Sequence, residues 1–427
     1  MHLDRVARFR WPIVLGWLAV VAALSAIWAS DGDWNWFRTG SRALLGDPVP
    51  GMEGGVHLYA SSPRTQIGPP GLVAATAFTW LPQPWDLWVA RLAMSLALVA
   101  MLWLVDRLAE AHGVDERARR RGTLLGGLVL VPSWVDVAVE FAHLDDVLVL
   151  LLVVAAMALL VRGRPTWAAV AIGLALATKP WAVVAAPVLL RGGWRGALRP
   201  GALAAAVAAA CWLPFLADPD TLGQLWQFRL QVQPQSALAV LGVEAGGPVP
   251  GWVRPVQMVG GLALGALAAR RGHWTGVLLV GLAVRVALDP NPLLYYTVGP
   301  VVGALVWDMT RTRTGIPWTA GTAMAAISLA PFADDDRVLG VLRLLICAGL
   351  VLAVLVRRRA SRAPAGGSHG AGEAAPQQPG ADQEQHRGEA HQDAQLRQDL
   401  AEAAPVPLDV GERLGGPRVG REQRDGA

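Results

Sequence analysis

Residues 141–161 read FAHLDDVLVLLLVVAAMALLV. The polar segment His143 to Asp146 is followed by an unbroken apolar run that ends at Val161. A helix that crosses a bilayer needs about 20 predominantly apolar residues, with a range of about 17–25. The sequence therefore predicts a transmembrane helix over 144–161, with a histidine and two carboxylates at one end.

Apolar runs of similar length recur along the chain. Of its 427 residues, 53% are hydrophobic and only 16% are charged, against roughly 25% charged residues in a soluble domain. The fold class predicted is an all-α, polytopic transmembrane bundle of about ten full spans. The first run follows three arginines and is long enough to be a retained helix rather than a cleaved signal peptide. The predicted spans are 12–29, 87–106, 122–136, 144–161, 201–217, 252–269, 274–288, 295–309, 316–332 and 338–356.

Charged residues alternate in sign between successive loops. Arginine-rich loops lie on the cytoplasmic side of membrane proteins, so we expect a multi-pass protein of the cell membrane with both termini in the cytoplasm. The basic residues thus report orientation rather than nucleic-acid binding. The arginine-rich segments are 1–10, 107–121, 162–164, 191–199, 270–273, 311–313 and 357–362, and the acidic ones are 30–53, 136–146, 218–220 and 333–336.

Two apolar segments do not fit this alternation as simple crossings. Residues 67–82 open with two prolines and are short, so we interpret them as a juxtamembrane helix on the outer face. Residues 165–190 have arginines on both flanks and are interrupted at Thr178-Lys179-Pro180. Proline disrupts a helix and lysine is costly inside a membrane. We therefore predict a re-entrant hairpin with its tip at Lys179, lining a polar cavity.

The first outer loop contains a second predicted surface helix, over 33–46. Its apolar face would carry Trp36, Phe37, Gly40, Ala43 and Leu44, with Arg38 and Arg42 off that face, and Gly46 would end the helix.

The composition changes after Arg362. Residues 363–427 are rich in Ala, Gly, Pro, Gln, Glu and Arg and nearly lack aromatic residues. Such a segment cannot bury a core. We expect a membrane domain over 1–362 and a disordered cytoplasmic tail over 363–427.

Several polar residues gather at the outer face in this topology. Asp31 and Asp33 follow the first span, and His143, Asp145 and Asp146 open the span 144–161. Lys179 is the only lysine among the 37 Lys and Arg residues, and it lies in an apolar segment of a chain that otherwise uses arginine.

Five segments together resemble the GT-C superfamily of membrane glycosyltransferases, in particular the bacterial mannosyltransferase-like group that uses polyprenol-phosphate sugars. They are the outer-loop helix from Asp33 to Gly46 followed by Leu58-Tyr59, Pro69-Pro70-Gly71-Leu72, His143-Leu144-Asp145-Asp146, the run from Ala171 to Pro180, and Tyr295-Tyr296. Their order and sidedness carry the resemblance, which covers roughly residues 12–356.

The resemblance implies transfer of a sugar, of the mannose or arabinose class, from a polyprenyl-phosphate donor to an extracytoplasmic glycolipid or cell-envelope glycan. It makes Asp33 the general base, with Asp31 as second choice. Lys179 would bind the donor phosphate. Substrate binding would also involve His143, Asp145, Asp146, Tyr295 and Tyr296. No cofactor is expected, the sequence has no evident His/Cys metal cluster, and a divalent-metal requirement stays open.

Each residue also has a structural alternative. Asp33 could cap its helix, Asp145 and Asp146 could be boundary charges, and His143 could be an ordinary interfacial residue. Lys179 could reach the membrane surface as a structural lysine, and the two tyrosines could belong to an aromatic belt.

At the level of function, the alternative is a multi-pass transporter or lipid flippase, because broken helices and buried cations also occur there. A transporter would concentrate polar groups near the membrane midplane, whereas these acids cluster at the outer face. A catalytically inactive family member is a third alternative.

Overall fold

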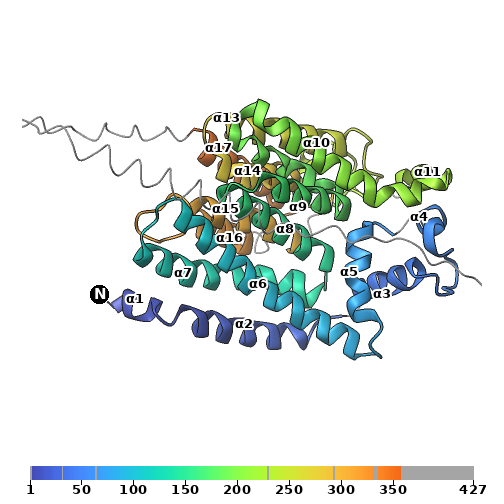
Figure 1. Ribbon diagram of the computed structural model, residues 1–427, viewed down its shortest axis with the longest axis horizontal. Helices are drawn as coiled ribbons and strands as arrows, with labels where there is room; N and C mark the ends of the chain where they lie inside the picture. Colours follow the sequence, from blue (N-terminus) through green and yellow to red (C-terminus); the bar gives the residue numbers. More distant parts are fainter. Residues whose placement is uncertain are drawn as a thin grey trace, which may run out of the picture. The chain divides into compact units, whose positions relative to one another are not determined.

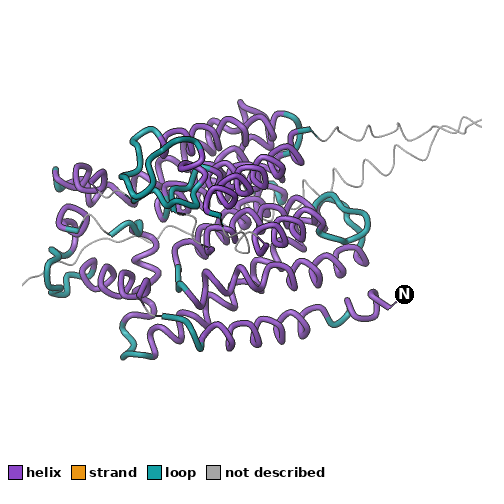
Figure 2. Tube along the Cα trace, turned by 180° about the vertical axis from the view of Figure 1, so that it is seen from behind, coloured by secondary structure: helices purple, strands orange, loops and turns teal. Residues whose placement is uncertain are grey.

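The computed structural model describes residues 2–30, 32–62, 65–227, 230–291, 294–329 and 335–356. The predicted tail, 363–427, and Asp31 lie outside the described residues. Within these ranges the chain forms helices and loops without a strand (Figure 2). The all-α prediction is therefore confirmed for the described part of the chain.

The helices follow one another closely along the chain (Figure 1). The α-helices are α1 (His2–Ala7), α2 (Arg10–Ala26), α3 (Gly32–Leu44), α4 (Leu58–Ser61), α5 (Pro69–Thr79), α6 (Trp85–Ala111), α7 (Glu116–Val135), α8 (Leu144–Val161), α9 (Pro165–Thr178), α10 (Gly193–Trp212), α11 (Asp220–Gln227), α12 (Ala237–Val240), α13 (Val253–Arg270), α14 (Val277–Ala287), α15 (Val298–Met309), α16 (Trp318–Leu329) and α17 (Asp336–Leu355). The 3₁₀ or π segments are η1 (Gly55–His57), η2 (Asp136–Glu140), η3 (Pro180–Gly192), η4 (Leu213–Ala217), η5 (Trp274–Gly276) and η6 (Leu294–Thr297).

Five helical segments of the described chain are long and apolar enough to cross a membrane. They are Trp85–Ala111, Glu116–Glu140, Leu144–Val161, Pro180–Ala217 and Asp336–Leu355, and shorter apolar helices cover Arg10–Ala26, Pro165–Thr178 and Trp274–Ala287. Every predicted span overlaps a helical segment of the described chain, and α8 has the predicted bounds. The number of crossings, about ten, stays a prediction.

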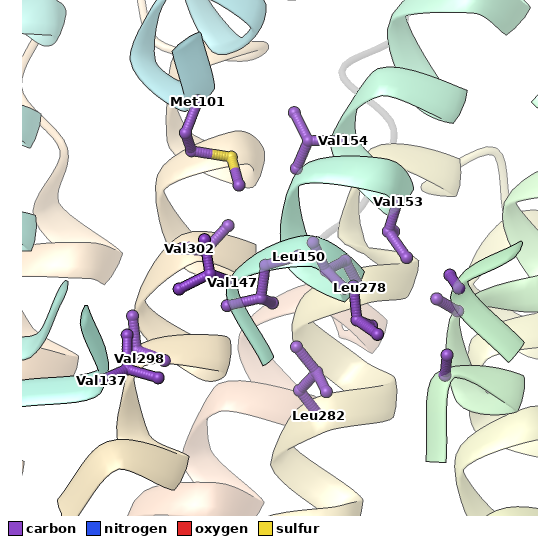
Figure 3. Packing of buried hydrophobic residues seen from close by; sticks show 14 of the residues in the cluster. Met101, Val137, Val147, Leu150, Val153, Val154, Leu278, Leu282, Val298 and Val302 are labelled. Atoms are coloured by element: carbon purple, nitrogen blue, oxygen red, sulfur yellow. The ribbon is translucent and has the colours of Figure 1, made fainter. Parts of the chain in front are cut away.

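A single core of buried apolar side chains joins most of these helices. Figure 3 shows part of it, with residues of α6, α8, α14 and α15 in one cluster. Glycines allow the closest approach. A Cβ on Gly281 of α14 would lie 2.6 Å from the carbonyl oxygen of Val184 in η3, so the η3 backbone packs directly on α14. Close backbone contacts of this kind are typical of membrane helix packing.

The segment 165–192 folds back on itself, as the predicted hairpin requires. Helix α9 ends at Thr178, Lys179 is extended, and η3 begins at Pro180. At the far end the Arg191 guanidinium donates to the Leu160 carbonyl, 2.6 Å away, in the last turn of α8. Lys179 contacts the first turn of α8. The hairpin therefore runs the whole length of α8, a segment long enough to cross a membrane, so its arms are longer than those of the re-entrant hairpin that was predicted.

The 3₁₀ conformation of η3 explains how its 13 residues extend along all 18 residues of α8. A 3₁₀ helix rises about 2.0 Å per residue against about 1.5 Å in an α-helix. The 13 residues of η3 thus extend about 26 Å, close to the length of about 27 Å for the 18 residues of α8. The second arm is stretched rather than shortened, and the tip lies level with Asp145.

Helix α3 forms where predicted and ends at Leu44, and Gly46 just beyond it has a φ of +89°. The predicted face was wrong in part. Arg38, which was placed off the apolar face, is buried. The physical reason is an internal partner, because the Arg38 guanidinium donates to the Asp86 carboxylate of α6 at 2.6 Å (Nε) and 3.2 Å (Nη2). This ion pair attaches α3 to the first turn of α6.

The predicted outer juxtamembrane helix is α5, which is too short to cross a membrane at 11 residues. In Figures 1 and 2, α3, α4 and α5 lie at the end of the bundle away from the N-terminus. At the N-terminal end, Arg121 pairs with Asp4 at 2.6 Å. The arginine-rich segments 1–10 and 107–121 thus lie together, as the charge alternation predicts. Which end faces the cytoplasm stays a prediction.

Candidate active site

A cavity of about 720 Å³ lies among α3, η3, α13, α14 and η6. Six of the eight residues singled out from the sequence line it: Asp33, His143, Asp145, Lys179, Tyr295 and Tyr296. Asp146 is not among the lining residues, but its carboxylate lies 2.8 Å from the Lys179 ammonium. Asp31 is outside the described residues. The structure therefore brings together residues that are separated by more than 250 positions in the sequence.

Asp33 lies in the first turn of α3, which begins one residue earlier at Gly32. Asp33 is therefore the second residue of the helix. Its side chain is 43% exposed and points at His143, with 3.4 Å between Oδ2 and the imidazole Nε2. A carboxylate that is held at one edge of a cavity and remains accessible has the geometry of a general base.

His143 links Asp33 to the carboxylates at the start of α8. Its Nδ1 lies 3.5 Å from one oxygen each of Asp145 and Asp146. Burial lowers the pKa of His143, but the carboxylates of Asp145 and Asp33 outweigh burial and raise that pKa from its ordinary value of 6.5 to about 9. The imidazole is therefore positively charged at neutral pH, and it lies against the Asp33 carboxylate.

Local backbone geometry directs His143 into the cavity. The π-helical turn η2 ends α7, and Ala142 then adopts a φ of +51°, a left-handed conformation that is uncommon for residues other than glycine. The His143 N–H donates to the carbonyl of Val137, 2.9 Å away. Strained backbone and π-turns are concentrated at functional sites, and here both adjoin the predicted histidine.

Lys179 has two carboxylate partners. Its Nζ lies 2.8 Å from Asp146 Oδ2 and 3.1 Å from Asp145 Oδ2. Both side chains are nearly inaccessible, at 2% exposure for Asp145 and 5% for Asp146, so they are not boundary charges at a membrane surface. His143, Asp145 and Asp146 are spaced closely enough to hold a metal ion, but the ammonium of Lys179 already lies against both carboxylates.

The hairpin tip is fixed by α5 as well as by this ion pair. The Gly68 N–H donates to the carbonyl of Thr178 at 3.0 Å. A Cβ on Gly68 would lie 1.9 Å from the Ala177 carbonyl oxygen, so only glycine permits this approach. The juxtamembrane helix therefore begins directly on the hairpin, which holds Lys179 in place.

Tyr295 and Tyr296 lie in the cavity rather than in an aromatic belt. The Tyr295 ring stacks on His143 with centroids 4.2 Å apart. The Tyr296 ring lies 4.4 Å from Tyr295 and 4.5 Å from the guanidinium carbon of Arg285. The two rings thus connect the acidic side of the cavity with a basic side.

The basic side was missed by the sequence reasoning. Its cavity-lining residues include Arg254 of α13, Arg285 of α14 and Asp289, just after α14. The signal was present in the sequence as Arg285 and Asp289, an arginine and an aspartate four residues apart at the end of an apolar run. An ionisable residue inside a membrane segment is itself an indication of function.

Comparison with known proteins gives an independent result. The family model described as glycosyltransferase family 87 matches residues 68–288, slightly more than half of the chain. The matched range contains His143, Lys179 and Arg285, whereas Asp33 and the two tyrosines lie outside it. No curated protein and no solved structure matches the chain significantly. The chain belongs to glycosyltransferase family 87, a family of membrane glycosyltransferases of the GT-C type.

Proposed function

We propose that this glycosyltransferase moves a sugar from a polyprenyl-phosphate donor to a hydroxyl of an extracytoplasmic glycolipid or cell-envelope glycan. The observation that carries the proposal is the position of Asp33. Its carboxylate is accessible at the edge of the cavity and lies against the charged imidazole of His143. Family membership favours sugar transfer over the transporter or flippase alternative. The sugar class, mannose or arabinose, rests on the resemblance described above.

In this proposal the acceptor hydroxyl enters the cavity beside Asp33. Its oxygen attacks the anomeric carbon of the donor and forms the new glycosidic bond. Its proton passes to the Asp33 carboxylate, and the bond between the anomeric carbon and the phosphate oxygen breaks. The electron pair of that bond leaves with the polyprenyl phosphate, so charge develops on the phosphate and needs a cationic site.

The roles of the other residues follow from their contacts. His143 orients Asp33, and Asp145 and Asp146 in turn hold His143. Lys179 was expected from the sequence to bind the donor phosphate. Its two carboxylate neighbours support a positioning role, because they already balance its charge. Tyr295 and Tyr296 are proposed to contact the sugar from the cavity wall.

The decisive experiment uses full-length protein in proteoliposomes with mannosyl- and arabinosyl-phosphopolyprenol donors. Asp33→Asn removes the proton acceptor and keeps the side-chain shape, and it should lower turnover by about 100-fold or more with donor binding unchanged. Asp47→Asn, in the exposed loop after α3, is the matched control and should be active. Asp31→Asn should be milder than Asp33→Asn.

Two outcomes would count against this assignment. Full turnover by Asp33→Asn together with loss by Asp31→Asn would exchange the two roles. Full turnover by both variants would remove the general base from this helix altogether. The sugar and the acceptor can be identified separately, from the glycolipid and cell-wall sugar profile of a strain that lacks the protein.

A further inference from the structure

The cavity has two ends of opposite charge. At one end the three carboxylates of Asp33, Asp145 and Asp146 face one lysine and one histidine. At the other end arginines outnumber carboxylates. Arg285 lies 3.9 Å from Asp289, and Arg254 lines the same cavity. Two arginines and one aspartate therefore line this end of the cavity, which carries excess positive charge.

Arg285 is held in a fixed position with its polar edge available. Its guanidinium carbon lies 4.8 Å from the Trp181 ring and 4.5 Å from the Tyr296 ring. Its side chain is 12% exposed. The distance to Asp289, 3.9 Å, is longer than a hydrogen bond. A guanidinium between two aromatic rings is preorganised for a phosphate, which it binds through parallel N–H donors.

Arg254 adds a second positive charge on the same cavity wall. It is half-buried in the first turn of α13 and lines the cavity beside Gln257. Gln257 in turn donates to the carbonyls of Arg285 and Leu288, at 3.1 Å and 2.9 Å. The start of α13 is therefore fastened to the end of α14, and the two arginines stand in one rigid unit.

The chemistry of displacement also separates the two ends. In a direct displacement at the anomeric carbon, the attacking hydroxyl and the leaving phosphate lie on opposite sides of that carbon. Asp33 marks the side of the hydroxyl. Lys179 is on that same side, because Asp145 and Asp146 connect it to His143 and so to Asp33. Arg285 lies against Tyr296, and Tyr295 separates Tyr296 from His143.

We infer that Arg285 and Arg254 form the phosphate subsite of this cavity and bind the phosphate of the polyprenyl-phosphate donor, with Asp289 limiting the affinity. This inference rests on the proposed function and refines it, since it transfers the phosphate from Lys179 to the opposite end of the cavity. The subsite would hold the same anion before transfer and after it, as the leaving group.

The test measures binding of a short-chain polyprenyl monophosphate to full-length protein in nanodiscs, with neutral polyprenol and inorganic phosphate as comparison probes. Arg254→Gln and Arg285→Gln should each weaken binding of the monophosphate by about tenfold or more and leave binding of the neutral polyprenol unchanged. Arg285→Lys should recover part of the affinity. Arg270→Gln, at the exposed end of α13, is the matched control and should bind as the wild type does.

Asp289→Asn provides a test that misfolding cannot imitate. Removing this negative charge should tighten binding of the monophosphate several-fold, because the arginines are then opposed by no carboxylate there. Wild-type affinity in both Arg→Gln variants would overturn the inference, and so would a loss of binding confined to Lys179→Met. Equally strong binding of inorganic phosphate would assign the subsite to the free anion and overturn the lipid donor.

The outcomes for the inference and for the proposed function can be separated. Binding of polyprenyl phosphate through Arg254 and Arg285 without any sugar transfer would leave the subsite in place and remove the proposed function. Sugar transfer by the wild type, combined with unchanged binding of polyprenyl phosphate by both arginine variants, would keep the proposed function and remove the subsite.

Discussion

Lys179→Met should destabilise the protein more than it weakens donor binding. The ammonium is 2.8 Å and 3.1 Å from two carboxylates, and the side chains are 14%, 5% and 2% exposed for Lys179, Asp146 and Asp145. At an effective dielectric constant of about 20, each pair has a gross attraction of about 5–6 kcal/mol. Desolvation offsets much of it, and breaking a buried pair from one side typically costs about 3–5 kcal/mol.

The assay is thermal unfolding of full-length protein in detergent, where Lys179→Met should lower the apparent Tm by several degrees. The control is the triple variant Lys179→Met/Asp145→Asn/Asp146→Asn. It removes the stranded carboxylates together with the lysine and should recover part of the loss. Unchanged Tm in Lys179→Met, combined with a large loss of donor affinity, would refute this reasoning and return the donor phosphate to Lys179.

Two further predictions concern the groups that hold Asp33. Because the pKa of His143 is raised to about 9 from 6.5, the stabilisation from its contacts is complete below pH 6.5 and is lost as the pH rises through about 9; the apparent Tm should fall over that range, and His143→Gln should lack the step. Asp86→Asn should cost about 3–5 kcal/mol of stability because it strands the buried guanidinium of Arg38. Turnover should fall as well, since α3 carries Asp33, whereas unchanged stability and turnover would contradict the positioning role of Asp86.

The positions of the helices were largely predictable because the bilayer sets the length of an apolar span. The hairpin was predictable for a related reason, since two arginine-rich flanks demand an even number of passes, and Arg191 does return to the end of α8. The face of α3 was not predictable. The alternation of residues suggested a helix lying in the headgroup layer, whereas an internal carboxylate, Asp86, draws Arg38 inward.

The members of the candidate site were predictable as a set, but their pairing was not. Sidedness alone placed Asp33, His143 and Lys179 near one another. Whether Lys179 contacts a substrate or a carboxylate depends on the position of the hairpin tip relative to α8, and a difference of a few ångströms decides it. Arg285 was overlooked because a boundary charge and a ligand-binding charge look alike in the sequence, and only its position between Trp181 and Tyr296 separates them.

The stretched arm η3 has a consequence for how the family can vary. Inserting one residue into a 3₁₀ helix moves everything beyond it by about 2.0 Å and turns it by about a third of a revolution. Since Arg191 is tied to α8 at the base and Lys179 to Asp145 and Asp146 at the tip, such a shift would break one attachment or the other. The length of η3 is therefore fixed by its two attachments. Homologous chains that keep both attachments should carry their insertions and deletions in the outer loops and leave the number of residues between 179 and 191 unchanged.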